Sequence, residues 1–294
     1  MKVGMIGLGA MGVGMARNLA RHDLLGAVWN RTAAKADTLA QELGVMAAPD
    51  PAAVAAECEV VLTCVSADAD VLEMVDALRE GLQPGGVVVD TSTISVATVK
   101  TAAERIADAG GRFLDAPVSG GREGAENGQL VVMAGGDAEA LVQAMPALEA
   151  IGKSVTHMGE SGSGQATKAV NQIMVAGINQ AVTEALAFGQ ASGLDMDRVI
   201  EVVGGGAAGN WFLSHRGPTM VRGTFEPGFK AALHHKDLGI CREMLERMGV
   251  SLPVVEMTLK HYERLMEQGH GEEDISTLYR LKQALFEEGN RRSL

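Results

Sequence analysis

The sequence predicts an α/β domain with a parallel sheet over residues 1–162 and an all-helical domain over residues 163–294. Three observations lead to this fold class. Short apolar runs alternate with amphipathic stretches in the first half of the chain, which is typical of βαβ units. After Gly164 helical periodicity takes over and no convincing strand follows. A chain of 294 residues is also long enough to form two domains.

Short apolar runs are expected to form the strands of the first domain. Runs of this kind indicate strands that are buried on both faces, so a parallel sheet covered by helices is predicted. The expected strands are Lys2–Ile6, Ala27–Trp29, Glu59–Val65, Gly86–Asp90, Phe113–Ala116 and Leu130–Ala134.

One long helix, over residues 163–192, is expected to link the two domains. Its apolar positions from Gln165 onward recur at helical spacing, and the glycine-rich segment 159–164 precedes it. Further helices are expected near residues 196–203, 238–248, 252–268 and 275–286.

Composition and charge exclude several classes of protein. With 25 basic and 37 acidic side chains the net charge is −12, which argues against nucleic acid as the main partner. Three scattered cysteines suit a reducing, cytoplasmic location. The N-terminal segment lacks the pattern of a secretion signal. Because no apolar stretch of about 18 residues occurs, a membrane span is not expected.

A glycine fingerprint, G-x-G-x-x-G, directly follows the first expected strand and opens the first helix. Its first glycine permits a tight turn, its second allows close approach of a pyrophosphate, and its third allows close packing of helix and strand. The helix N-terminus would face the negative charge. The alternative is a glycine-rich turn without a ligand. The predicted cofactor residues here, which make the domain Rossmann-like, are Gly7, Leu8, Gly9, Ala10, Met11 and Gly12.

The end of the second strand favours NADP(H) over NAD(H). An acidic residue at this point would bind the ribose 2′-hydroxyl, but the sequence has Asn30, Arg31 and Thr32. Asn30 can still meet a ribose hydroxyl, while Arg31 and Thr32 can bind a 2′-phosphate. The alternative is that Arg31 is an ordinary exposed arginine, in which case use of NAD(H) is possible.

Two further segments lie at strand ends, where open α/β sheets bind ligands. Val65 and Ser66 end the third strand and are expected to line the cofactor path. After the fifth strand, the hydroxyl of Ser119 and the backbone N–H groups of Gly120 and Gly121 form a plausible carboxylate nest, or else a structural turn only. Arg122 follows, either to pair with a substrate carboxylate or to lie on the surface, and the sequence does not decide between these.

The sequence resembles the β-hydroxyacid dehydrogenase family over nearly its whole length. Four motifs in the family's order carry the resemblance: GLGAMGVGMARNL from Gly7, DAPVSGG from Asp115, GSGQATKAVNQ from Gly162 and KDLG from Lys236. The family includes 3-hydroxyisobutyrate dehydrogenase, tartronate semialdehyde reductase and the glyoxylate/succinic semialdehyde reductases.

The resemblance implies a Rossmann-like domain, a long interdomain helix, an all-helical domain and an active site in the cleft between the domains. It implies that Lys168 is the catalytic lysine and that Ser119, Gly120 and Gly121 bind the substrate carboxylate. Thr93 and Lys236 would lie near the nicotinamide, and Asp237 near the substrate. Where the family often has an asparagine, four residues after the lysine, this chain has Gln172 preceded by Asn171, so either amide could contact substrate.

The chemistry of the residues agrees with that assignment. Hydride transfer to a carbonyl leaves an alkoxide that needs a proton, which a group with a pKa near neutrality supplies. A helix N-terminus and partial burial are both expected to lower the pKa of Lys168. The alternative is a solvated helix lysine. Asn171 or Gln172 would face the same side of the helix and orient the lysine or the substrate oxygen.

The second domain offers fewer signals. Lys236 and Asp237 form either the site implied by the resemblance or a surface ion pair, and Phe229 either caps the cofactor pocket or belongs to the core. No pattern of His, Cys or carboxylate residues suggests a metal site.

The sequence thus predicts an oxidoreductase that prefers NADP(H) and interconverts a short β-hydroxy acid and its semialdehyde. Its substrate would be a small carboxylate or aldehyde, and the large helical domain suggests a homodimer or homotetramer. The alternatives are a non-catalytic NADP-binding sensor and an imine-reductase-like enzyme, although the latter typically lacks a lysine at the position of Lys168.

Overall fold

The computed structural model describes residues 1–292. The chain forms two compact units, Met1–Lys168 and Ala169–Leu294, whose boundary falls inside one helix, α8 (Ser163–Ala191). The long helix predicted over residues 163–192 is therefore confirmed, and it ends one residue earlier than predicted.

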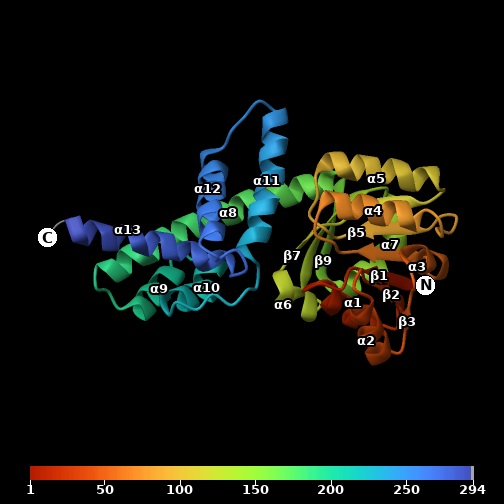
Figure 1. Ribbon diagram of the computed structural model, residues 1–294, viewed down its shortest axis with the longest axis horizontal. Coiled ribbons are helices and arrows are strands. Elements are labelled where there is room, and N and C mark those ends of the chain that lie inside the picture. The colour runs from red at the N-terminus through yellow and green to blue at the C-terminus, as the bar shows by residue number, and fades with distance from the viewer. Residues whose placement is uncertain (293–294) are drawn as a thin grey trace. The chain divides into compact units, whose positions relative to one another are not determined.

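The first unit is a Rossmann-like α/β domain, as predicted (Figure 1). Its helices and strands alternate along most of this part of the chain. The strands are β1 (Val3–Ile6), β2 (Leu25–Trp29), β3 (Met46–Ala47), β4 (Val60–Thr63), β5 (Val87–Asp90), β6 (Arg112–Asp115), β7 (Val118–Ser119), β8 (Leu130–Gly136) and β9 (Gly152–Gly159). The helices are α1 (Gly12–Arg21), α2 (Ala33–Leu43), α3 (Pro51–Glu57), α4 (Asp68–Leu78), α5 (Val96–Asp108), α6 (Gly121–Glu126) and α7 (Ala138–Ile151).

The sheet has the order β3-β2-β1-β4-β5-β6-β8-β7, with β9 beside β8. Every neighbouring pair from β3 to β6 is parallel, so all these strands end at the same edge. The prediction of a parallel sheet is wrong for the run at Leu130, because β8 pairs antiparallel with β6. The short connection through β7 and α6 returns the chain beside β6 in the opposite direction, which a βαβ crossover would not do.

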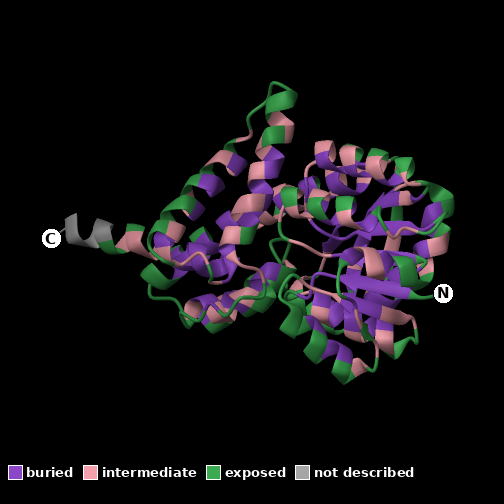
Figure 2. Cartoon of the chain, turned by 45° about the vertical axis from the view of Figure 1, so that its right-hand side comes forward, coloured by how far each residue is buried: buried purple, intermediate pink, exposed green. Residues whose placement is uncertain are grey.

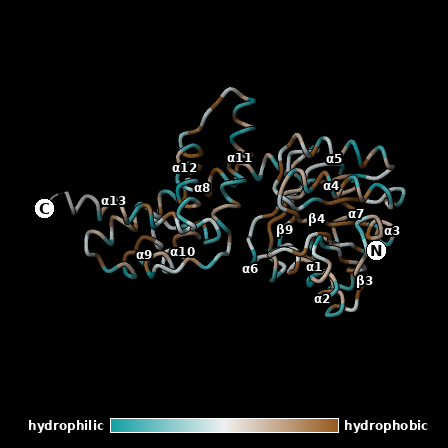
Figure 3. Tube along the Cα trace, viewed as in Figure 1, coloured by the Kyte–Doolittle hydropathy of each residue, from teal (hydrophilic) through white to brown (hydrophobic). Residues whose placement is uncertain are grey.

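Each face of this sheet has its own apolar core. Helices α1, α2, α6 and α7 pack on the face that carries Met5 and Leu62, while α3, α4 and α5 pack on the face that carries Ile6 and Val61. Figure 2 shows the resulting burial of the central strands, and Figure 3 shows their apolar character. Alternate strand residues thus enter opposite cores, which leaves the strand ends to carry polar residues.

The second unit is helical, as predicted. Beyond its part of α8 it contains α9 (Met196–Gly204), α10 (Trp211–Val221), α11 (Ala231–Arg247), α12 (Pro253–Glu267), η1 (Ile275–Thr277) and α13 (Leu278–Arg292). Helix α11 begins seven residues before the predicted Leu238, because its first turns carry buried polar side chains such as His234 and Asp237 instead of an apolar stripe.

Tyr262 and Tyr279 are the largest side chains fully buried in the core of this unit. Within the described part of the chain, every helix is too short or too polar to cross a membrane.

Candidate active site

The turn between β1 and α1 has the backbone that the glycine fingerprint predicts. Gly7 has a φ of +91°, and a Cβ on Gly12 would lie 1.9 Å from the carbonyl oxygen of Gly7. A Cβ on Gly9, in contrast, would meet nothing within 4 Å, so open space lies in front of this residue. The turn therefore fits a dinucleotide pyrophosphate approaching the N-terminus of α1.

Asn30 fixes this turn from the end of β2. Its Oδ1 accepts a hydrogen bond from the backbone N–H of Leu8 at 2.9 Å, and its Nδ2 donates to the carbonyl oxygen of Thr32 at 3.2 Å. The side chain thus holds the turn. Thr32 precedes α2, is exposed, and makes no side-chain cap to that helix.

Arg31 is exposed but already carries two acidic neighbours. One of its terminal nitrogens, Nη2, lies 2.7 Å from Oδ1 of Asp70 and 3.0 Å from Oε2 of Glu73. Both acids come from α4, about 40 residues along the chain. The sequence shows no carboxylate at the end of β2, but the fold brings two carboxylates to the guanidinium predicted to bind a 2′-phosphate.

A buried polar network joins the ends of β4 and β5. Oδ1 of Asp90 accepts hydrogen bonds from the hydroxyls of Thr63 at 2.6 Å and Ser92 at 2.7 Å, and Oγ of Ser92 accepts from the backbone N–H of Val65 at 2.9 Å. Oδ2 of Asp90 is buried without a partner. Burial raises the pKa of Asp90 to about 6, against the lowering effect of the two hydroxyls. The network fixes the backbone beside the predicted cofactor residues Ser66, which is exposed, and Thr93, which is half-buried.

Asp115, at the end of β6, holds the start of α8. Its two oxygens accept hydrogen bonds from the backbone N–H groups of Gly162 at 2.8 Å and Gln165 at 2.9 Å. Burial raises the pKa of this carboxyl, while these two hydrogen bonds lower it. The side chain of Gln165 adds a second attachment by donating to the carbonyl oxygen of Ser92 at 2.7 Å.

Lys168 lies one turn further along α8, and its side chain is only 7% exposed. Its ammonium donates a hydrogen bond to the carbonyl oxygen of Val118 at 2.9 Å. Because Val118 directly precedes Ser119, Gly120 and Gly121, the structure brings the predicted catalytic lysine to the backbone of the predicted carboxylate nest. Gly120 and Gly121 have φ values of +136° and +61°, a region that favours glycine.

The predicted residues of the second unit form a hydrogen-bonded chain. Nδ2 of Asn171 donates to Oε1 of Gln172 at 2.8 Å, and Nε2 of Gln172 donates to Oδ2 of Asp237 at 2.7 Å. The ammonium of Lys236 lies 3.0 Å from the other Asp237 oxygen. Gln172 and Asp237 are buried, while Asn171 and Lys236 are partly exposed. The structure therefore brings these four predicted residues together in one connected group of hydrogen bonds and an ion pair.

Buried His234 contacts this hydrogen-bonded group at Gln172. Its Nε2 lies 3.2 Å from the carbonyl oxygen of Gln172, and its Nδ1 lies 3.0 Å from the Tyr262 hydroxyl. Phe229 packs against the His234 ring and the core of this unit, and its backbone N–H donates to Asp274. No group of three or more His, Cys, Asp or Glu side chains within the described residues is arranged to hold a metal ion.

Sequence reasoning missed the roles of Asp90, Asp115, Gln165 and His234. Asp115 and Gln165 lie inside motifs that were recognised, but their partners are 47 to 73 residues away. Asp90 and Asp115 each stand in the sequence as a carboxylate at the end of an apolar run, a position that an exposed loop residue would occupy equally well.

Comparison with known proteins identifies the family of the chain. Residues 2–159 match the model for the NAD binding domain of 6-phosphogluconate dehydrogenase, and residues 162–282 match the NAD-binding model of NADP-dependent 3-hydroxyisobutyrate dehydrogenase.

Two curated relatives and one solved structure extend over most of the chain. The chain is 38% identical to 2-hydroxy-3-oxopropionate reductase of Escherichia coli over 86% of its own length and 87% of that protein. It is 30% identical to glyoxylate/succinic semialdehyde reductase 1 of Arabidopsis thaliana over 95% and 97%, respectively. A solved structure of Psf3 with NADP⁺ and 2-OPP aligns with a TM-score of 0.87 at 27% identity, over 95% of this chain and 99% of that one. The chain is thus an NAD(P)-dependent oxidoreductase that belongs to the β-hydroxyacid dehydrogenase family.

Proposed function

We propose that the protein interconverts a short β-hydroxy acid and its semialdehyde, prefers NADP(H), and uses Lys168 as the general acid and base. One observation carries the proposal: the buried ammonium of Lys168 lies 2.9 Å from the backbone oxygen that precedes the Ser119–Gly121 segment. A proton donor and a carboxylate nest thus adjoin within one unit, as an aldehyde that also carries a carboxylate requires.

The residues of the glycine turn, Gly7 to Gly12, hold the pyrophosphate in this proposal, and Asn30 keeps the turn in place. A bound nicotinamide would supply or accept the hydride. Val65, Ser66 and Thr93 are proposed to line its path, and we keep Lys236 and Phe229 as further proposed cofactor residues.

Lys168 donates a proton to the substrate oxygen during reduction and takes it back during oxidation. The hydroxyl of Ser119 and the backbone N–H groups of Gly120 and Gly121 bind the substrate carboxylate. Because Lys168 is buried and hydrogen-bonded, its ammonium is held in one position, and this fixed position favours proton transfer to and from the substrate oxygen.

Asn171 is the amide that we propose to contact substrate. Both functional atoms of the Gln172 amide are engaged, by Asn171 and by Asp237, and this side chain is 1% exposed. Gln172 and Asp237 would then hold Asn171 in place. Asn171, the residue before Gln172, would therefore do in this chain what an asparagine at the position of Gln172 does in the family.

The test is steady-state kinetics with glyoxylate, succinic semialdehyde, tartronate semialdehyde and methylmalonate semialdehyde, each with NADPH and with NADH. We expect turnover of at least one semialdehyde, faster at limiting NADPH than at limiting NADH. Binding of NADPH without any oxidation across the panel would favour the non-catalytic sensor instead. Activity confined to imines would favour an imine-reductase-like enzyme, which the buried Lys168 argues against.

Cofactor preference depends on a competition for Arg31. Arg31→Ala should raise KM for NADPH about tenfold, because a charge-assisted contact with the 2′-phosphate is lost, and should leave KM for NADH unchanged. Glu73→Gln should lower KM for NADPH, since it removes a carboxylate 3.0 Å from the guanidinium. Kinetics with both cofactors measure the two effects. An equal loss for NADH in Arg31→Ala would exclude the 2′-phosphate assignment.

Assembly as a homodimer or homotetramer and a cytoplasmic location stay predictions from the sequence. The second unit exposes several large apolar side chains, which supports an interface between copies of the chain. They include Phe188, Val202, Met248 and Leu285. Light scattering in solution would decide the oligomeric state.

A further inference from the structure

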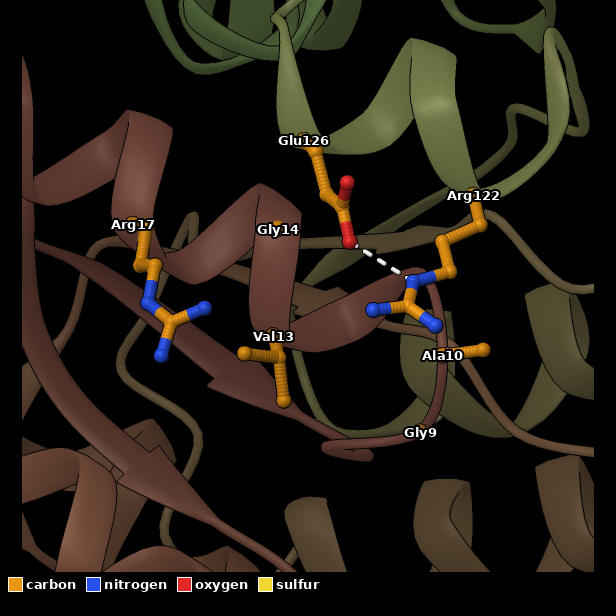
Figure 4. A pocket seen from close by; sticks show the side chains of 7 residues that line it. All are labelled: Gly9, Ala10, Val13, Gly14, Arg17, Arg122 and Glu126. Atoms are coloured by element: carbon orange, nitrogen blue, oxygen red, sulfur yellow. Dashed lines mark hydrogen bonds and ion pairs between the residues drawn. The ribbon is translucent and has the colours of Figure 1, made fainter.

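Arg122 lies beside the glycine turn, although the sequence left its role open. It sits in the first turn of α6 and lines a hollow of about 190 Å³ in the first unit. Figure 4 shows this hollow, with the guanidinium of Arg122 on the side of Ala10. The other lining residues are Gly9, Ala10, Val13, Gly14, Arg17 and Glu126.

The backbone of α6 is fastened to α1, so the position of Arg122 is built into the fold. A Cβ on Gly14 would lie 2.8 Å from the backbone of Ala125, which means that only glycine permits this close approach. Buried Asn18 crosses the same contact and donates to the carbonyl oxygen of Ala125 at 2.7 Å. Arg122 is therefore presented to the turn by a rigid contact between helices.

The two arginines that line the hollow differ in the number of hydrogen bonds that each makes to its acidic partner. Arg17 makes a two-point contact with Glu42, at 2.7 and 2.9 Å, which satisfies one edge of its guanidinium. Arg122 makes a single contact with Glu126, from Nε to Oε1 at 2.7 Å. One of its two terminal nitrogens points toward Ala10 in Figure 4, and the other points away from Ala10 across the hollow.

We propose that Arg122 binds the pyrophosphate of the dinucleotide, and that Glu126 holds the guanidinium in place while weakening that contact. The inference rests on the proposed function only in so far as the glycine turn binds a dinucleotide. A pyrophosphate carries two negative charges, whereas the turn and the helix N-terminus offer only partial positive charge. Arg122 supplies a full positive charge at the same place.

The lining of the hollow favours the pyrophosphate over the substrate carboxylate as the ligand of Arg122. Gly9 and Ala10 of the fingerprint line the hollow, whereas Ser119, Gly120 and Gly121 of the proposed carboxylate nest do not. Arg122 should therefore act equally on NADPH and NADH, because the pyrophosphate is common to both. This separates its role from that of Arg31.

The experiment is equilibrium binding of NADPH and NADH, followed by nicotinamide fluorescence without substrate. Arg122→Gln should raise the Kd for both cofactors by about tenfold and flatten the dependence of Kd on ionic strength. Glu126→Gln should lower both Kd values several-fold, because it removes a competing negative charge. The double variant R122Q/E126Q should lose the gain of Glu126→Gln.

Arg79→Gln is the matched control. It removes the same charge from the same unit, also from an exposed ion pair, but follows the last residue of α4, away from the strand ends that carry the turn. Its Kd values should equal those of the wild type. Unchanged Kd values in Arg122→Gln, or a loss for NADPH alone, would overturn the proposal.

Binding also separates this proposal from the proposed function. A protein that binds both cofactors but turns over no semialdehyde contradicts the function and still tests Arg122. A wild-type protein that binds neither cofactor contradicts both.

Discussion

Lys168→Ala should lower kcat by about 10²- to 10⁴-fold, the usual contribution of a positioned general acid, and leave the Kd for NADPH unchanged. The ammonium is buried and donates to the carbonyl oxygen of Val118, so a water molecule cannot easily take over its position and function. Steady-state kinetics measure the loss, and nicotinamide fluorescence measures cofactor binding.

Two further variants separate proton transfer from charge. Lys168→Arg keeps a cation at this position but cannot give up a proton near neutral pH, so it should be nearly as slow as alanine. Lys100→Ala, on the exposed side of α5, should behave like the wild type. Turnover that survives in Lys168→Ala would disprove the assigned role.

Asp115→Ala should lower the free energy of unfolding by about 2–5 kcal/mol, because it leaves two buried backbone donors unpaired at the start of α8. The first turn of α8 should then shift and move Lys168 away from Val118, so kcat should also fall. Urea unfolding followed by circular dichroism gives the stability, and kinetics at a temperature where the variant is folded give kcat.

Asp137→Ala is the control for this prediction. Asp137 also caps a helix, accepting a hydrogen bond from the Ala140 N–H at 2.8 Å, but its side chain is 55% exposed. Its loss should cost only about 1 kcal/mol, since water can replace an exposed cap. Asp115→Asn keeps one acceptor and should fall between the two. An Asp115→Ala variant as stable as Asp137→Ala would contradict the role assigned to burial.

Much of the fold could be predicted because buried strands and amphipathic helices leave a local pattern. The runs around Val61 and Val88 are apolar on both sides, as two cores require. The apolar pattern did not predict elements whose residues are exposed or are buried polar side chains. Strand β9 (Gly152–Gly159) is mostly exposed, so it has no apolar run, and α11 begins with polar residues that are buried because they bond one another.

The candidate site also contains one part that could be predicted from the sequence and one part that could not. The glycine turn is a local motif, and its backbone matches the prediction. The acids that meet Arg31 and the carboxylate that caps α8 come from other strands and helices, at separations that no local pattern reports. Pairing across the chain depends on the strand order, which a single sequence does not specify.

The partnerless oxygen of Asp90 has a consequence for the proton balance of folding. The ordinary pKa near 3.8 rises to about 6 in the folded protein, so between these two pH values folding takes up a proton. This contribution to stability is neutral below about pH 4, turns unfavourable as the pH rises, and above pH 6 amounts to a cost on the order of 3 kcal/mol. The hydrogen bonds that Asp90 makes between the two strand ends thus come at a cost in stability. Its share of the free energy of unfolding falls between about pH 4 and pH 6, and a pH series of urea unfolding that compares the wild type with Asp90→Asn would isolate this share from groups with lowered pKa values, such as Glu273 and Asp274.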